Sequence, residues 1–222
     1  MTTTEMWLMF GAAVVIVLLF SLACHKKFTA KEISIIGLMA ALSYVAYLFR
    51  VPFMGSGSSF HLGNTFTALT ALLLDGVSGG LAGAIGLSIA DIAAGDPGYA
   101  ITTFILKFII GLVCGLVAHK VLHLHDKDPK TMTKTRYVGL VSAAAFSGLL
   151  VNVFTDPFLG YFRNRFIFGM DADLTTAFAK IASGVTLVNS IVSCVCCVVL
   201  FLAIYPALKK ARLLPNQKKE NV

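Results

Sequence analysis

Charged residues are scarce in this chain. Asp, Glu, Lys and Arg make up 13% of its 222 residues, whereas hydrophobic residues make up 57%. A water-soluble domain has about 25% charged residues and a disordered chain has low hydrophobicity, so the composition excludes both classes. Because a helical span takes about 20 residues, six or seven spans with short connections would use nearly the whole length. The sequence therefore predicts an all-α integral membrane protein without an appended soluble domain.

Sequence motifs for nucleotide and metal chemistry are also missing. There is no Gly-x-x-x-x-Gly-Lys-Ser/Thr motif, so we expect the chain not to hydrolyse ATP by itself. There is no His-Glu-x-x-His motif, and the five cysteines lack zinc-type spacing and are interpreted as apolar packing residues. His119, His123, His125 and Asp126 could hold a metal, but the neighbouring lysines favour a solvated connection. We predict no metal site and no cofactor of the chain's own.

The net charge of +7 is concentrated in the connections between apolar runs. Thirteen of the 18 Lys and Arg residues fall in three clusters, at 26–31, 120–136 and 209–219. Seven spans with the N-terminus outside place all three clusters on the cytoplasmic side, and only three basic residues in outer connections. This arrangement predicts a multi-pass protein of the cell membrane, with membrane lipid around it and a cytoplasmic C-terminus. Nucleic acid is not expected as a partner, because the basic residues do not form one polar face.

The apolar runs predict the order of the spans. They lie at residues 6–23, 33–49, 61–74, 77–94, 99–118, 137–155 and 176–205. The run 61–74 is short, and Asp75-Gly76 marks a turn after it, so we expect a bent or partial pair of helices here. Asp156-Pro157 is expected to end the sixth span. No strand-like alternation and no internal repeat is found, and the Gly/Ser stretch 55–59 is expected to form an outer connection.

Polar residues interrupt several of these runs. They are Asn64, Asp91, Lys107, Asn152, Lys180 and Asn189. An ionisable group inside a bilayer costs about 2.5 to 3.5 kcal/mol on insertion scales, so such groups normally face a cavity or each other. Four of the six lie near the outer ends of their helices, and Lys107 and Asn189 lie deeper. We predict a substrate pocket open to the outside, closed above by His61, Tyr99 and the Gly/Ser connection. The alternative is an internal Asp91–Lys107 ion pair that only holds helices together.

Small residues at helical spacing predict close helix packing. Gly79, Gly83 and Gly86 form one smooth face, which we assign to packing within the protein. A second smooth face on the run 33–49 carries Gly37 and Ala41, backed by Ala40. This face is predicted to dock on a partner subunit.

Several stretches together resemble the substrate-binding S components of energy-coupling factor (ECF) vitamin transporters. They are His61-Leu62-Gly63-Asn64, Leu72-Leu73-Leu74-Asp75-Gly76, the glycine-rich 79–86, Asp91, Tyr99 and Thr103-Phe104-Ile105-Leu106-Lys107 with Gly111. The resemblance covers residues 31–208 and implies a six-helix prokaryotic membrane subunit that captures a vitamin or vitamin precursor from outside. The residues 1–30 would then be an extra N-terminal transmembrane helix with a basic linker, and 209–222 a basic cytoplasmic tail.

The resemblance also implies partners that this chain lacks. They are a transmembrane coupling subunit, which would dock on the small-residue face at Gly37, Ala40 and Ala41, and two cytoplasmic ATPases. The mixture of Asp, Lys, Asn and aromatic residues suits a small polar heteroaromatic ligand. The pattern of Asn64, Asp91 and Lys107 resembles the branch assigned to pyridoxine or hydroxymethylpyrimidine, and riboflavin is the larger alternative.

An ion-coupled carrier and a membrane enzyme are the two alternative classes of function. A stand-alone ion-coupled carrier would also use Asp91 and Lys107, but such carriers often show an inverted repeat, and none is found. A membrane enzyme would need a nucleophile or metal constellation, and none is found either. We therefore expect a binding subunit of a transporter rather than an enzyme.

Overall fold

The computed structural model describes residues 11, 14, 17, 18, 27–53, 58–127 and 131–214. Gly11, Val14, Val17 and Leu18 are helical. The rest of the predicted span 6–23, the tip of the Gly/Ser connection and the end of the basic tail lie outside the described residues. The separate role predicted for the N-terminal helix therefore stays a prediction.

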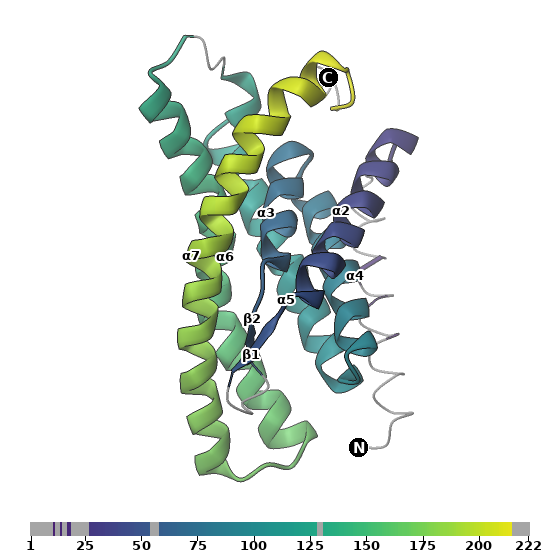
Figure 1. Cartoon of the computed structure of the whole chain (residues 1–222), viewed down its shortest axis with the longest axis vertical. Coiled ribbons are helices and arrows are strands. Elements are labelled where there is room, and N and C mark those ends of the chain that lie inside the picture. The colour runs from purple at the N-terminus through teal and green to yellow at the C-terminus, as the bar shows by residue number, and fades with distance from the viewer. Residues whose placement is uncertain are drawn as a thin grey trace.

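Within the described ranges the fold is a helical bundle (Figure 1). Its helices are α2 (Ala30–Leu48), α3 (Gly63–Leu73), α4 (Gly76–Ala93), α5 (Pro97–Gly115), α6 (Lys134–Phe162) and α7 (Ala172–Lys210). All but α3 are long and apolar enough to cross a membrane; α3 has only 11 residues. The chain is thus a helical, multi-pass membrane protein. The turn expected at Asp75-Gly76 is confirmed, because the Asp75 carboxylate caps α4 by accepting from the N–H groups of Val77 and Ser78.

A short hairpin joins α2 to α3, and the prediction of no strands was wrong here. Strands β1 (Val51–Phe53) and β2 (Ser58–Phe60) pair antiparallel, with Val51 opposite Phe60. The rings of Phe53 and Phe60 meet edge to face at 5.9 Å between centroids. Three residues per strand are too few for alternation to be visible in the sequence, although Val and Phe favour extended backbone.

Helix α6 does not end at Asp156-Pro157 as predicted. It continues to Phe162 and then into a π-helical turn, η3 (Arg163–Ile167). Proline removes one backbone donor from a helix, and here the packing of α6 against α7 outweighs that loss. Helix α7, at about 1.5 Å per residue, reaches roughly 60 Å and so extends beyond the bilayer core.

The helices α4 and α5 touch backbone to backbone. A Cβ atom at Gly111 would overlap the backbone nitrogen of Gly80, and one at Gly115 would overlap that of Gly76. Gly79 and Gly83 similarly admit α3, next to Ala71 and Thr67. These contacts agree with the predicted packing role of the glycine-rich segment, and they fix α3, α4 and α5 as one compact unit behind the pocket.

The predicted solvated histidine connection was wrong for two of its members. His119 Nε2 lies 2.8 Å from the Ala71 carbonyl oxygen, and His125 Nε2 lies 2.9 Å from that of Leu72. These carbonyls belong to the last turn of α3, where a helix leaves its acceptors without internal partners. The two imidazoles therefore cap the short helix rather than extend into water. Among the described residues, no group of three or more potential ligands is arranged to hold a metal ion.

Candidate functional site

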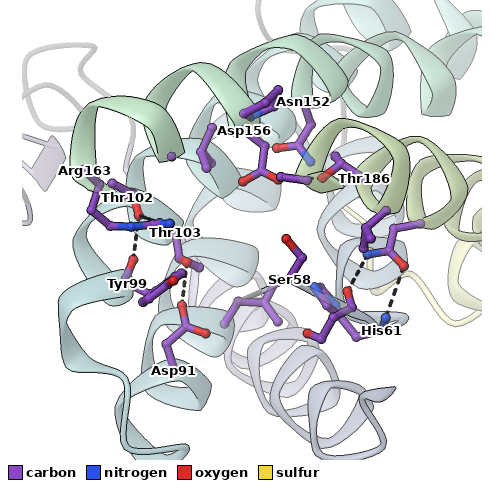
Figure 2. Close-up of a pocket in the computed structure, with 18 of the residues that line it drawn as sticks. Ser58, His61, Asp91, Tyr99, Thr102, Thr103, Asn152, Asp156, Arg163 and Thr186 are labelled. Atoms are coloured by element: carbon purple, nitrogen blue, oxygen red, sulfur yellow. Dashed lines mark hydrogen bonds between the residues drawn. The ribbon is translucent and has the colours of Figure 1, made fainter. Parts of the chain in front are cut away.

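A polar cavity of about 110 Å³ opens between β2 and helices α2 to α7. Its polar lining consists of Tyr47, Ser58, Ser59, His61, Asn64, Asp91, Asp96, Tyr99, Thr102, Thr103, Lys107, Asn152, Asp156, Arg163, Asn164, Thr186 and Asn189. Figure 2 shows Asp91 and Asp156 on opposite sides of the open space, with Tyr99 and Arg163 on one flank and His61 on the other. Side chains from opposite ends of the sequence therefore converge on one site.

The Asp91 carboxylate is buried, at 5% exposure, and is held by two hydroxyl groups. Tyr47 on α2 donates to one oxygen at 2.7 Å, and Thr103 on α5 donates to the other. Because each hydroxyl comes from a different helix, Asp91 ties α2, α4 and α5 together at the wall of the pocket. The carboxylate has further lone pairs and can still accept from a ligand.

Lys107 is also buried, at 7% exposure, and lines the same cavity. Among the described residues its ammonium group has no hydrogen-bond acceptor and no ion-pair partner, so the predicted alternative of a structural Asp91–Lys107 pair was wrong. A buried ammonium without a partner is costly. Of the polar groups in the pocket, the Lys107 ammonium would therefore be stabilised most by an acceptor on a ligand.

Asn64 and Asn152 each present a side-chain oxygen that has no hydrogen-bond partner among the described residues. Each side chain is 1% exposed, and neither Oδ1 atom has a hydrogen-bond partner in the described part of the chain. Buried amide oxygens are normally bonded, so each is an acceptor available to a ligand hydroxyl or amine. With the Lys107 donor, the pocket offers complementary polar groups on several sides.

Asn189 lines the cavity and is also bonded to the backbone. Its Oδ1 accepts from the His61 N–H at 3.2 Å, and its Nδ2 donates to the Ser59 carbonyl at 2.9 Å. Both ends of the amide are thus bonded to the backbone at the end of β2. Asn189 lines the cavity and holds the hairpin against α7.

His61 is neutral and presents a fixed donor. Its Nδ1 accepts from the Gly63 N–H at 3.2 Å, so the proton of the neutral ring is on Nε2. Burial, together with the positive charges of Lys107 and Arg50, lowers the pKa of His61 to about 3. The ring also packs edge to face on Tyr47, with centroids 5.1 Å apart.

Arg163 and Asp156 are pocket residues that the sequence prediction missed. The Arg163 guanidinium lies 3.6 Å above the Tyr99 ring and donates to Thr102 Oγ1 at 2.9 Å. Asp156 accepts from the Thr186 hydroxyl of α7. The missed signal was their spacing. Asn152 and Asp156 on α6 and Arg163 at the start of η3 recur on one helical face, but only if the helix continues through Pro157.

Seven of the eight predicted site residues line the pocket: His61, Asn64, Asp91, Tyr99, Lys107, Asn152 and Asn189. Lys180 does not, and its inclusion was wrong. It is exposed, whereas its neighbours Ala179 and Ala182 line the cavity, so Lys180 lies on another face of α7.

The predicted docking face is divided by the structure. Gly37 and Ala41 are exposed, and no atom of the described residues lies within 4 Å of a Cβ built at Gly37. Ala40 is 7% exposed, and a Cβ at Gly86 would overlap its carbonyl oxygen. Including Ala40 in the docking face was therefore wrong, because it packs inward on α4.

Comparison with known proteins decides the family. The family model described as "ECF-type riboflavin transporter, S component" matches residues 27–210. The chain belongs to this S-component family. No curated protein matches. The solved structure of ThiT from Listeria monocytogenes superposes with a TM-score of 0.60 at 18% identity, covering 83% of this chain and 97% of that one, and so shares the fold. The S component is therefore a vitamin-binding transport subunit, not a member of an enzyme class.

Proposed function

We propose that this S component captures a small hydroxylated nitrogen heteroaromatic, of the type of pyridoxine or hydroxymethylpyrimidine, for uptake driven by partner ATPases. The observation that carries the proposal is the Lys107 ammonium, which has no partner among the described residues and lies in a buried polar cavity. A neutral or anionic acceptor on the ligand, such as a ring nitrogen or a phenolic oxygen, would satisfy it.

The rest of the lining suits the other groups of such a ligand. The free oxygens of Asn64 and Asn152 would accept from hydroxymethyl or amino groups. His61 Nε2–H would donate, and the Asp91 carboxylate would accept. Tyr99, held under Arg163, would offer a ring edge or hydroxyl at the flank. Each polar group of a single-ring ligand thus finds a partner of the opposite kind.

The size of the cavity also favours a single ring. Pockets for drug-sized ligands typically enclose about 300 to 1,000 Å³. The cavity here, at about 110 Å³, is smaller than that range. Riboflavin is the second candidate, favoured by the description of the matching family. Its three fused rings would require the hairpin or the outer end of α6 to move outward.

The proposed partners are a transmembrane coupling subunit and two cytoplasmic ATPases of an ECF module. The proposed orientation has the N-terminus outside and the C-terminus in the cytoplasm of a prokaryotic cell. The basic connection before α6 and the C-terminal end of α7 lie together at one end of the bundle, away from the turn between α6 and α7 (Figure 1). Positive charge marks a cytoplasmic end, which supports this orientation.

The test is to identify the ligand and the requirement for partners. The purified chain is analysed for a copurified small molecule by mass spectrometry, and pyridoxine, hydroxymethylpyrimidine and riboflavin are titrated by calorimetry. We expect tight binding of a single-ring ligand without ATP, and concentrative uptake into liposomes only with the coupling module. Selective binding of riboflavin would replace the substrate assignment. Uptake by the chain alone, driven by a proton or sodium gradient, would contradict the proposed S-component function.

A further inference from the structure

A second cavity lies at the opposite end of the bundle, between the first turns of α6 and the last turns of α7. It encloses about 600 Å³ and shares no residue with the polar pocket. Val138, Val199, Leu202 and Ala203 contribute an apolar lining, while Lys134 and Tyr137 stand at its α6 side. An apolar lining with polar groups on one side suits an amphipathic ligand. We call this cavity the groove.

The start of α6 has the properties of an anion site. Its N-cap residue, Thr133, makes no side-chain capping bond, and the first bond from inside the helix is Tyr137 N–H to the Thr133 carbonyl. The N–H groups of residues 134–136 precede that first bond, so they lack intrahelical acceptors. Free N–H groups and the helix dipole favour a phosphate at this position, and the exposed Lys134 ammonium adds a positive charge.

Tyr137 supplies an independent sign of a missing ligand. The side chain is 5% exposed and lines the groove, yet its hydroxyl has no hydrogen-bond partner among the described residues. Buried tyrosine hydroxyls usually find a partner. A phosphate or ester oxygen of a ligand in the groove would supply that acceptor.

The surrounding charges define the occupant further. Lys209 Nζ lies 5.7 Å from the ring of Tyr205, which also lines the groove. Basic pockets between transmembrane helices near the cytoplasmic surface bind the headgroups of anionic lipids. The groove combines these basic groups with apolar side chains, so its polar and apolar parts match a headgroup and an acyl chain.

We propose that this groove holds one anionic phospholipid. The phosphate lies at the first turn of α6, where it accepts from backbone N–H groups, Lys134 and Tyr137, and one acyl chain lies along Val138, Val199 and Leu202. The lipid braces α6 against α7 at the end of the bundle away from the vitamin. This site does not depend on which vitamin the upper pocket binds.

The experiment compares two lipids on the full chain. The thermal stability of the delipidated protein in detergent is measured with added phosphatidylglycerol and with phosphatidylcholine, and retained lipid is counted by native mass spectrometry. We expect phosphatidylglycerol to raise the melting temperature more than phosphatidylcholine. Lys134→Glu and Tyr137→Phe should each weaken phosphatidylglycerol binding roughly tenfold, because each removes a hydrogen bond to a charged group. Inorganic phosphate alone should have no effect.

Controls separate the lipid site from general charge and from folding. Lys120→Glu makes the same charge change at an exposed lysine of the same connection that does not line the groove, and should leave the lipid effect intact. Tyr137→Phe removes only an unbonded hydroxyl and should fold normally, and vitamin binding should persist in every variant. Equal effects of the two lipids, or variants that keep the phosphatidylglycerol effect, would overturn the proposal. Stabilisation by inorganic phosphate alone would also overturn it. Loss of coupling-subunit assembly in Lys134→Glu with lipid binding unchanged would assign the groove to the partner instead.

Discussion

Lys107 and Asp91 line the same buried pocket without forming an ion pair with each other. Asp91 instead accepts from Tyr47 and Thr103, so hydroxyl groups of the protein itself stabilise its carboxylate. Lys107 has no such partner within the described residues. The two groups therefore have different roles. Asp91 holds helices α2, α4 and α5 together at the wall of the pocket, and Lys107 is available to donate to an acceptor on a ligand.

The Tyr47–Asp91 hydrogen bond should couple α2 to α4. Tyr47→Phe and Asp91→Asn should each lower the free energy of unfolding by about 1 to 3 kcal/mol, because each removes or weakens a hydrogen bond to a charged group. Their effects should be non-additive by at least 0.5 kcal/mol in a double-mutant cycle, as expected for residues in contact. Tyr47→Phe combined with Thr186→Val, which acts on the separate Asp156 contact, is the additive control. Full additivity of the first pair would contradict the assigned bond.

Stability should depend on pH through His61. Its pKa of about 3 in the folded protein lies below the value of about 6.5 of an unfolded histidine, so protons bind the unfolded chain preferentially between these values. Stability is therefore complete above about pH 6.5 and decreases as the pH falls toward 3. In His61→Gln the slope of melting temperature against pH should be shallower between pH 6.5 and 4.5 than in the wild type. Identical slopes would show that His61 does not titrate as a buried neutral group.

The glycine contacts predict a sharp sensitivity to one methyl group. Gly111→Ala places a Cβ on the backbone of Gly80 and should destabilise the protein by about 1 to 3 kcal/mol through overpacking. Gly139→Ala is the matched control, because in the described part of the chain nothing lies within 4 Å of a Cβ there. It should be neutral or stabilise α6 by up to about 1 kcal/mol, since alanine favours helix over glycine. Thermal unfolding of both variants checks the difference, and equal losses would be the contrary result.

The exposed part of the predicted docking face gives a test of assembly. Gly37→Leu and Ala41→Leu should weaken association with the coupling subunit, because leucine holds helix backbones apart, while vitamin affinity stays unchanged. Gly184→Leu adds the same side chain at an exposed position of α7 with open space around it. Pull-down of the coupling subunit should decrease for the first two variants only. Assembly and transport that are unchanged in both would exclude this face.

The sequence made the pocket predictable where a residue broke an apolar pattern. Asn64, Asp91, Lys107 and Asn152 stood out because polar groups inside a span need a cavity. Lys180 stood out for the same reason but faces outward, since a lysine near the end of a long helix can reach water on any face.

The missed features depend on contacts that no local pattern contains. Arg163 was assigned to a connection because Pro157 was interpreted as a helix end. Packing on α7 instead allows α6 to continue to Phe162. His119 and His125 were interpreted as solvated because their acceptors, at the end of α3, lie about fifty residues away. Local propensity sets the helices, but long-range packing decides where they end and which side chains they bring together.

The most direct test of the account is the Lys107→Met variant, measured for both ligand affinity and thermal stability. If Lys107 is a ligand-binding cation, affinity for the vitamin should fall about 10- to 150-fold, the value of a hydrogen bond to a charged group. The melting temperature without ligand should be unchanged or higher, because an unpaired buried charge has been removed. Lys180→Met, at the exposed lysine of α7, should change neither quantity. A Lys107→Met protein that loses stability yet binds the vitamin normally would contradict the pocket assignment.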